Sequence, residues 1–325
     1  MQFKGKVYYN LLRACQGSVP GCKDWEMLDY RALKEEELFS RLKKEGVALT
    51  PQSYRNSAEV SSSPEELAEM LVGGEGNEER REKVYLLLFE LWRRLCSEQP
   101  SVSIFCDELD YQISCYGEKG ENGEVVEQLL EQLENILDET QEEGVSSEEI
   151  FEIVASGCAE DLERFIYVYA ADQIDCGNEV LASELIDGFY PYLREKCWLD
   201  FLRCRLVALV DPKEGTLMWQ HLLDKLQEEP DLDLLSEMLY SLIYHEEVPL
   251  FYAVFELAET LLESEEDFQV LLQIVGEYFS VLDKEEEEKK ILAILAKRSF
   301  FQKDRQLSID DGDLQEVKKV LSLSS

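Results

Sequence analysis

The chain contains GTLMWQHLLDKLQEEPDLD at residues 215–233 and, 34 positions later, PLFYAVFELAETLLESEED at residues 249–267 (249 − 215 = 34). In both segments, apolar residues recur at the three- and four-residue spacing of an amphipathic α-helix. Both segments end in an acidic turn, which in the first one contains Pro230. A helix and a turn that return at a constant stride predict a helical unit that recurs along the chain.

The same stride extends over much of the chain. Two interleaved series of candidate helix starts fall near residues 147, 180, 214, 248 and 284, and near residues 160, 198, 231 and 265. The breaks between these helices carry the expected signals, with Asp231 and Ser264 placed as N-caps. Superposed repeats place apolar residues in columns, among them Cys204, Met238 and Leu272, and Val210, Tyr244 and Tyr278.

The 34-residue stride resembles that of the tetratricopeptide-like α-solenoids, whose unit is a helix–turn–helix. The resemblance covers roughly residues 146–298, with a degenerate extension back to about residue 79, and Pro230 stands where that family often has proline. The family's small Gly and Ala positions are largely missing. The resemblance implies an all-α, right-handed array of antiparallel helical hairpins with a concave surface. A compact helical bundle built from the same helices is the alternative.

Composition, together with the residues that begin and end helices, predicts three parts of the chain. Ser63-Pro64-Glu65-Glu66 combines an N-cap, a first-turn proline and an acidic third position, so a short helix should begin there within a Ser- and Pro-rich stretch. The predicted parts are an N-terminal helical segment over 1–46, a flexible linker with a short helix over 47–77, and an α-helical repeat domain over 78–325 with a C-terminal capping helix near 311–322.

Acidic residues far outnumber basic ones. The chain has 70 Asp and Glu against 32 Lys and Arg, a formal net charge of −38. Residues 1–57 hold 10 basic and 7 acidic side chains (10 − 7 = +3), and the remainder holds 22 and 63 (22 − 63 = −41). This charge argues against direct binding of nucleic acid and against adsorption on anionic membranes. The expected partner is another protein of basic character.

No motif in the sequence carries recognisable catalytic or metal-binding chemistry. The two histidines, His221 and His245, lack the spaced partners of known metal motifs, and the nine cysteines form no CxxC pair. We therefore expect no catalytic residue, no cofactor and no metal site. The cysteines, together with an N-terminus that lacks a long apolar run, predict free thiols in a reducing cytoplasm.

Aromatic side chains are the remaining candidates for a binding site, because Trp and Tyr are enriched at interface hot spots. The residues expected to line a groove and bind a partner are Tyr190, Tyr192, Trp198, Trp219 and Tyr252. The expected function is a scaffold, adaptor or chaperone-like module that captures a peptide or helix in a concave, acidic, aromatic-lined groove.

Three other functions stay open at this point. The chain could be an acidic charge-shielding chaperone, or a nucleic-acid mimic, for basic proteins. It could be a structural subunit that associates end to end, or an enzyme that uses a carboxylate or cysteine site. The sequence leaves the oligomeric state open.

Overall fold

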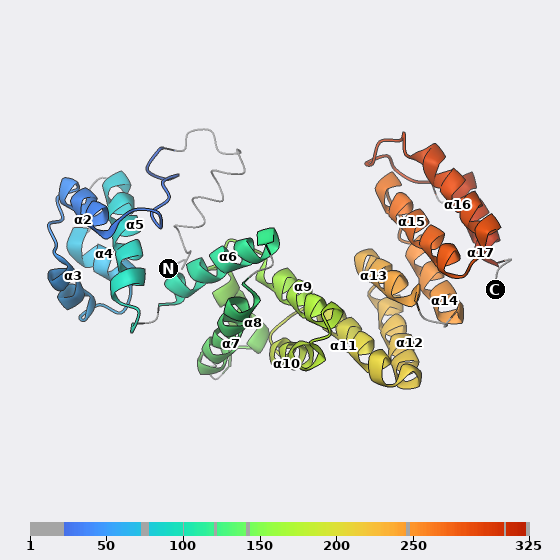
Figure 1. Ribbon diagram of the computed structural model, residues 1–325, viewed down its shortest axis with the longest axis horizontal. Helices are drawn as coiled ribbons and strands as arrows, with labels where there is room; N and C mark the ends of the chain where they lie inside the picture. The colour runs from blue at the N-terminus through green and yellow to red at the C-terminus, as the bar shows by residue number, and fades with distance from the viewer. Residues whose placement is uncertain are drawn as a thin grey trace. The chain divides into compact units, whose positions relative to one another are not determined.

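The computed structural model describes residues 23–72, 78–99, 101–119, 122–140, 144–244, 248–308 and 310–322. Within these ranges the chain forms sixteen α-helices and no strand, and one isolated β-bridge joins Ser264 to Gln306 (Figure 1). The fold is therefore all-α, as the sequence predicts. Residues 1–22 of the predicted segment 1–46 lie outside the described residues.

The chain divides into two compact units, residues 1–169 with 188–194 and residues 170–187 with 195–325. Helices of the first unit are α2 (Glu35–Lys44), α3 (Pro51–Ala58), α4 (Pro64–Val72), α5 (Glu78–Leu95), α6 (Val102–Lys119), α7 (Gly123–Glu139) and α8 (Ser147–Ala155). Helices α9 (Leu162–Asp175) and α10 (Glu179–Phe189) contribute residues to both units. Helices of the second unit are α11 (Lys196–Val210), α12 (Pro212–Glu228), α13 (Leu232–Leu242), α14 (Val248–Glu259), α15 (Glu265–Val281), α16 (Glu285–Arg298) and α17 (Gly312–Ser322).

The two predicted series of helix starts are confirmed to within two residues. Helices α8, α10, α12, α14 and α16 begin at residues 147, 179, 212, 248 and 285, and α9, α11, α13 and α15 begin at residues 162, 196, 232 and 265. The expected N-caps are present, because Asp231 accepts a hydrogen bond from the Leu234 N–H (3.1 Å) and Ser264 accepts one from the Asp267 N–H (3.2 Å). Side-chain chemistry at the caps thus sets where these helices begin.

The segment expected as a flexible linker, 47–77, differs in the structure, because its described part holds both α3 and α4. Thr50 caps α3 in a reciprocal capping box with Ser53. Tyr54 on α3 is fully buried, and its hydroxyl donates to the Leu88 carbonyl of α5 (2.7 Å). Its ring belongs to one hydrophobic core that α2, α3, α4 and α5 share. The predicted limits at 46 and 78 therefore cut through a packed core.

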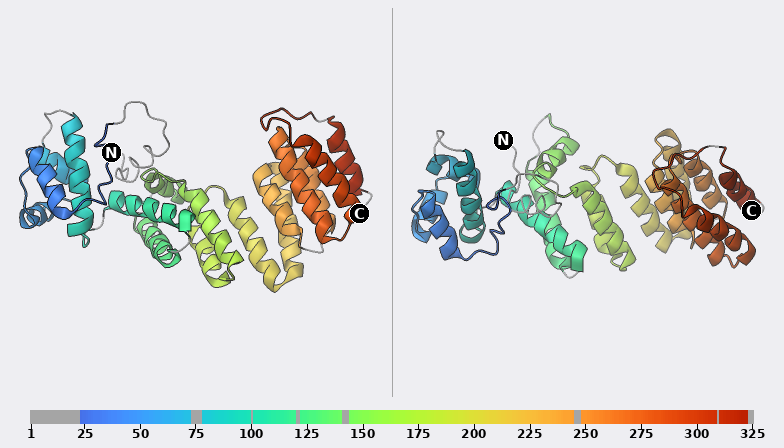
Figure 2. Two further views of the ribbon diagram at one scale, coloured as in Figure 1. Left: turned by 45° about the horizontal axis from the view of Figure 1, so that its top comes forward. Right: turned by 90° about the horizontal axis from the view of Figure 1, so that it is seen from above.

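The second unit is a stack of helix pairs. Helices α11 and α12, α13 and α14, and α15 and α16 pack as neighbours, and α11 with α13, α12 with α14, and α13 with α15 link successive pairs (Figure 2). Helices α11 and α12 approach each other closely at Gly215, where a Cβ atom would lie 2.7 Å from the Cα of Ala208. A small residue is therefore required at this crossing, although the sequence shows no repeated glycine.

The predicted C-terminal helix is confirmed as α17. Asp311 caps it by accepting hydrogen bonds from the N–H groups of Asp313 (2.9 Å) and Leu314 (3.4 Å). Helix α17 packs on α16, and the Tyr252 hydroxyl of α14 donates to the Leu321 carbonyl (2.6 Å). The apolar face of the last described helix is thereby covered.

Candidate functional site

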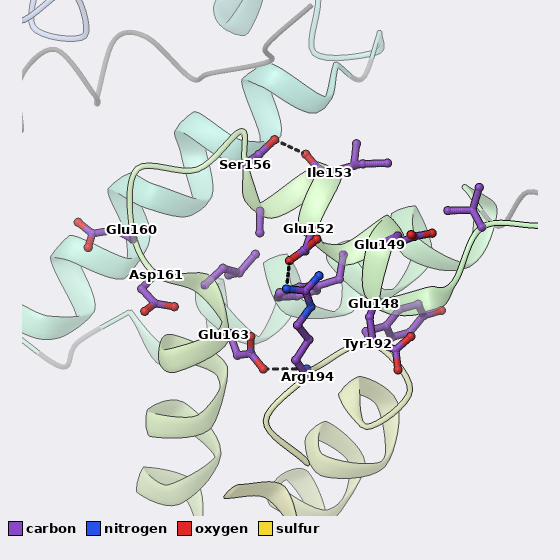
Figure 3. Close-up of a pocket in the computed structure, with 14 residues that line it drawn as sticks. Glu148, Glu149, Glu152, Ile153, Ser156, Glu160, Asp161, Glu163, Tyr192 and Arg194 are labelled. Carbon is purple, nitrogen blue, oxygen red and sulfur yellow. Dashed lines mark hydrogen bonds and ion pairs between the residues drawn. The ribbon is translucent and has the colours of Figure 1, made fainter. Parts of the chain in front are cut away.

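A cavity of about 800 Å³ lies within the first unit, along one face of α8 and beside the first turn of α9 (Figure 3). Residues 192–194, which follow α10, close one side of it. Its charged lining comprises six carboxylates and one guanidinium: Glu148, Glu149, Glu152, Glu160, Asp161, Glu163 and Arg194. The lining therefore carries five more negative than positive charges (6 − 1 = 5). We call this cavity the acidic pocket.

The acidic lining follows from local helix chemistry. Glu149 completes a capping box with Ser146 at the start of α8, and Glu152 lies nearly one turn further along the same helix. Asp161 accepts a hydrogen bond from the Arg164 N–H (3.1 Å) as α9 begins. Carboxylates are favoured in the first turn of a helix because they offset its positive end. Helix starts thus concentrate negative charge where α8 and α9 meet.

Arg194 is the one basic side chain in the pocket lining. Its Nη1 lies 2.6 Å from Glu152 Oε1, and its backbone N–H donates to Glu163 Oε1 (2.9 Å). Figure 3 shows the guanidinium directed toward Glu152. The Arg194 side chain is 59% exposed, so it remains in contact with solvent. This pair shows that the pocket accommodates a guanidinium group.

The floor of the pocket is apolar. Phe151, Leu162 and Tyr192 line it and are nearly fully buried. The Tyr192 hydroxyl donates to the Asp138 carboxylate of α7, which holds the ring in place. Ile153 on α8 also lines the pocket and is 55% exposed. A lining that combines apolar side chains with carboxylates suits a lysine or arginine side chain, whose stem is apolar and whose head is cationic.

A buried carboxylate holds the loop that leads into the pocket. Asp110 on α6 is fully buried, and it accepts hydrogen bonds from the N–H groups of Ala159 (2.8 Å) and Glu160 (3.0 Å). The pKa of Asp110 is raised to about 7, mainly by burial and to a lesser degree by the carboxylates of Asp107 and Glu160, against the lowering effect of the two hydrogen bonds. The position of the loop therefore depends on a group that titrates near neutral pH.

This titration predicts a pH dependence of stability. Folded Asp110 keeps its proton up to about pH 7, whereas an unfolded aspartate loses it near pH 4. Between these values the folded chain binds more protons, so this contribution to the free energy of unfolding decreases as the pH rises. Relative to Asp110→Asn, the wild type should gain about 1–3 kcal/mol between pH 8 and pH 5 in urea unfolding. The control Asp224→Asn changes an exposed aspartate; parallel pH profiles for wild type and Asp110→Asn would refute the assignment.

One of the sequence-predicted partner-binding residues lines the acidic pocket. Tyr192 lines the acidic pocket, and half-buried Tyr190 lies beside it in the chain without lining it. The other three lie in the second unit. Their role in binding stays a prediction.

Each of those three side chains has a structural contact. Trp198 Nε1 donates to Asp231, the N-cap of α13 (3.0 Å), and Tyr252 donates to Leu321 as described above. Trp219 is 2% exposed and meets the Phe201 ring edge-on, with centroids 5.3 Å apart. Among the described aromatic residues of this unit, Tyr244 and Phe300 are far more exposed, at 71% and 88%.

Sequence reasoning missed the acidic pocket. Glutamates at the start of a helix are common on solvated surfaces, so these carboxylates do not stand out in the sequence. The available signal was two acidic helix starts close together, at Ser146-x-x-Glu149 and at residues 160–163. Nothing in the sequence around Tyr192 and Arg194 indicates that these two residues line the pocket.

In the part of the chain that the structure describes, no three His, Cys, Asp or Glu side chains are grouped as metal ligands. None of the described helices combines the length and apolar character needed to cross a bilayer. His221 is exposed on α12, and His245 lies outside the described residues.

Comparison with known proteins adds no family assignment. No family model, no curated protein and no solved structure matches the chain.

Proposed function

We propose that the chain is a non-enzymatic protein-interaction module of the tetratricopeptide-like α-solenoid class, acting as a scaffold, adaptor or chaperone-like protein. The confirmed stride of helix starts and the stacked pairs of the second unit support the solenoid class. The observation that carries the function is the acidic pocket, with its five excess negative charges above an apolar floor. We propose that it captures a basic segment of a partner protein.

The energetics of such capture favour recognition of several cations together. Two unit charges 4 Å apart gain about 4 kcal/mol near a protein surface, but desolvation and side-chain ordering cancel most of it. The net contribution of one exposed pair is about 0.2–1 kcal/mol. Burial of the lysine or arginine stems on Phe151 and Tyr192 would add apolar stabilisation. The negative field should make association fast and sensitive to salt.

A second candidate function rests on the charge of the whole chain. With a net charge of −38, the protein could shield basic proteins over its entire surface or compete with nucleic acid for them. In that case carboxylates away from the pocket would matter as much as those inside it. This difference separates the two functions experimentally.

We predict that Glu148→Gln/Glu152→Gln weakens binding of a basic peptide about tenfold, because two pocket carboxylates lose their charge. The probe is a fluorescein-labelled peptide of alternating lysine and leucine, and binding is measured by fluorescence anisotropy in about 0.05 M salt. The matched control, Glu127→Gln/Glu131→Gln, removes two exposed carboxylates with the same spacing on α7. It should leave affinity within about twofold.

Three results would contradict the proposal. Equal weakening by both double variants would favour the charge-shielding function. No effect of the pocket variant would remove the pocket as the binding site. Affinity that does not change between about 0.05 M and 0.5 M salt would exclude an electrostatic mechanism.

A further inference from the structure

The first 22 residues have the chemistry that the acidic pocket would recognise. The segment MQFKGKVYYNLLRACQGSVPGC contains Lys4, Lys6 and Arg13 and no aspartate or glutamate (3 − 0 = +3). It also contains apolar and aromatic residues between and around these cations: Phe3, Val7, Tyr8, Tyr9, Leu11 and Leu12. A segment with three cations and apolar side chains is complementary to a pocket with five excess negative charges and an apolar floor.

This segment is connected to the unit that contains the pocket. It precedes Lys23, the first described residue, whose ammonium group pairs with Glu79 of α5 in the first unit. An extended chain of 22 residues can span up to about 75 Å. A tethered segment is present at an effective concentration on the order of millimolar at its target, so even weak contacts can keep the target occupied.

The cations of another cation-rich stretch, residues 297–303, are already paired within the second unit. Residues 297–303 contain Lys297, Arg298 and Lys303, and these side chains pair with Asp313, Glu265 and Glu266 in the second unit. By contrast, the pocket already holds one cation of this chain, the Arg194 guanidinium at 2.6 Å from Glu152. The pocket thus already pairs a carboxylate with a cation, which is the contact that the cations of the N-terminal segment would make.

We propose that residues 1–22 bind the acidic pocket of their own chain and compete there with the basic segment of a partner. This inference rests on the proposed function, because it assigns an internal competitor to the same pocket. The apparent affinity for a partner is then reduced by the fraction of pockets that the segment occupies. A partner must displace the segment, which makes the N-terminus autoinhibitory.

The test uses the full chain and a fluorescein-labelled peptide with the sequence of residues 1–22. The variant Lys4→Gln/Lys6→Gln/Arg13→Gln removes the cations of the internal segment. The control Lys213→Gln/Lys290→Gln/Lys319→Gln removes three exposed lysines of the second unit and gives the same net charge. We expect the N-terminal variant to bind the peptide at least about fivefold more tightly than the wild type, and the control to change affinity less than about twofold.

A second measurement locates the binding. Adding Glu148→Gln/Glu152→Gln to the N-terminal variant should weaken peptide binding about tenfold, whereas adding Glu127→Gln/Glu131→Gln should not. Equal peptide affinity in the wild type and the N-terminal variant would overturn the inference, even if both depend on the pocket. Peptide binding that ignores the pocket substitutions would also overturn it.

The outcomes separate the inference from the proposed function. If the lysine–leucine peptide depends on the pocket while the residue 1–22 peptide does not, the inference fails and the function stands. If neither peptide depends on the pocket, both fail. Light scattering covers the remaining case: a wild-type dimer that the N-terminal variant converts to a monomer would place the segment in the pocket of a second copy and overturn binding within one chain.

Discussion

Replacing Arg298 by alanine is expected to lower the free energy of unfolding of the second unit by about 3–5 kcal/mol. Arg298 is 1% exposed, and its guanidinium donates to Glu265 from Nε (2.8 Å) and Nη2 (2.6 Å). Its Nη1 donates to Asp311 (2.9 Å) and Asp313 (3.0 Å). The side chain therefore joins the start of α15, the end of α16 and the start of α17. Its removal leaves the fully buried Glu265 carboxylate without its cation.

Urea unfolding followed by circular dichroism measures this loss. The control Lys297→Ala removes an exposed cation that also pairs with Asp313 (2.9 Å), and it should cost less than about 1 kcal/mol. The double variant Arg298→Met/Glu265→Leu replaces both buried charges by apolar groups and should recover much of the loss. A loss for Arg298→Ala no larger than that for Lys297→Ala would show that the buried network does not stabilise the C-terminal helices.

Replacing Trp219 by alanine is expected to destabilise the second unit by about 3–5 kcal/mol. The indole is 2% exposed on α12 and meets Phe201 of α11 edge-on at 5.3 Å. Truncation removes this contact and leaves a cavity between α11 and α12. The two helices already touch where Gly215 meets Ala208, so they cannot move closer together to fill the cavity.

The same variant distinguishes packing from partner binding. Trp219→Phe keeps most of the apolar volume and should lose about half as much stability as Trp219→Ala. If the role is packing, both variants should bind the basic peptide with wild-type affinity at a temperature where they remain folded. Lower affinity with unchanged unfolding would instead assign Trp219 to partner binding, as the sequence predicts.

The apolar columns that the 34-residue repeat predicts are buried only in part. Cys204, Met238 and Leu272 are at most 2% exposed, so this column is core. In the other column, Val210 and Tyr244 are 88% and 71% exposed, and only its third member is buried. Val210 is the last residue of α11 and Tyr244 follows the end of α13, whereas Tyr278 lies inside α15. The first two are therefore exposed because they lie at helix ends, although the 34-residue spacing is kept.

Helix α3 lies in a stretch for which the sequence predicts a linker. The stretch before residue 63 is rich in Ser, Thr and Pro, but Thr50, Pro51 and Ser53 form a helix start there. The short helix contributes Tyr54 and Ala58 to a core built mainly by α5. A helix of one or two turns is stabilised by the surface it packs on, and that surface lies thirty or more residues further along the chain.

The amino-acid sequence by itself determined the all-α class, the helix starts of both series and the cap residues Asp231 and Ser264, because these depend on contacts within a few residues. Only the tertiary structure decided which carboxylates enclose a pocket and which aromatic side chains are core. Glu152 meets Arg194 and Tyr192 meets Asp138 across separations of 42 and 54 residues (194 − 152 = 42; 192 − 138 = 54). Contacts of this range depend on how helices pack, and helix packing is set by the shapes of both partner surfaces together.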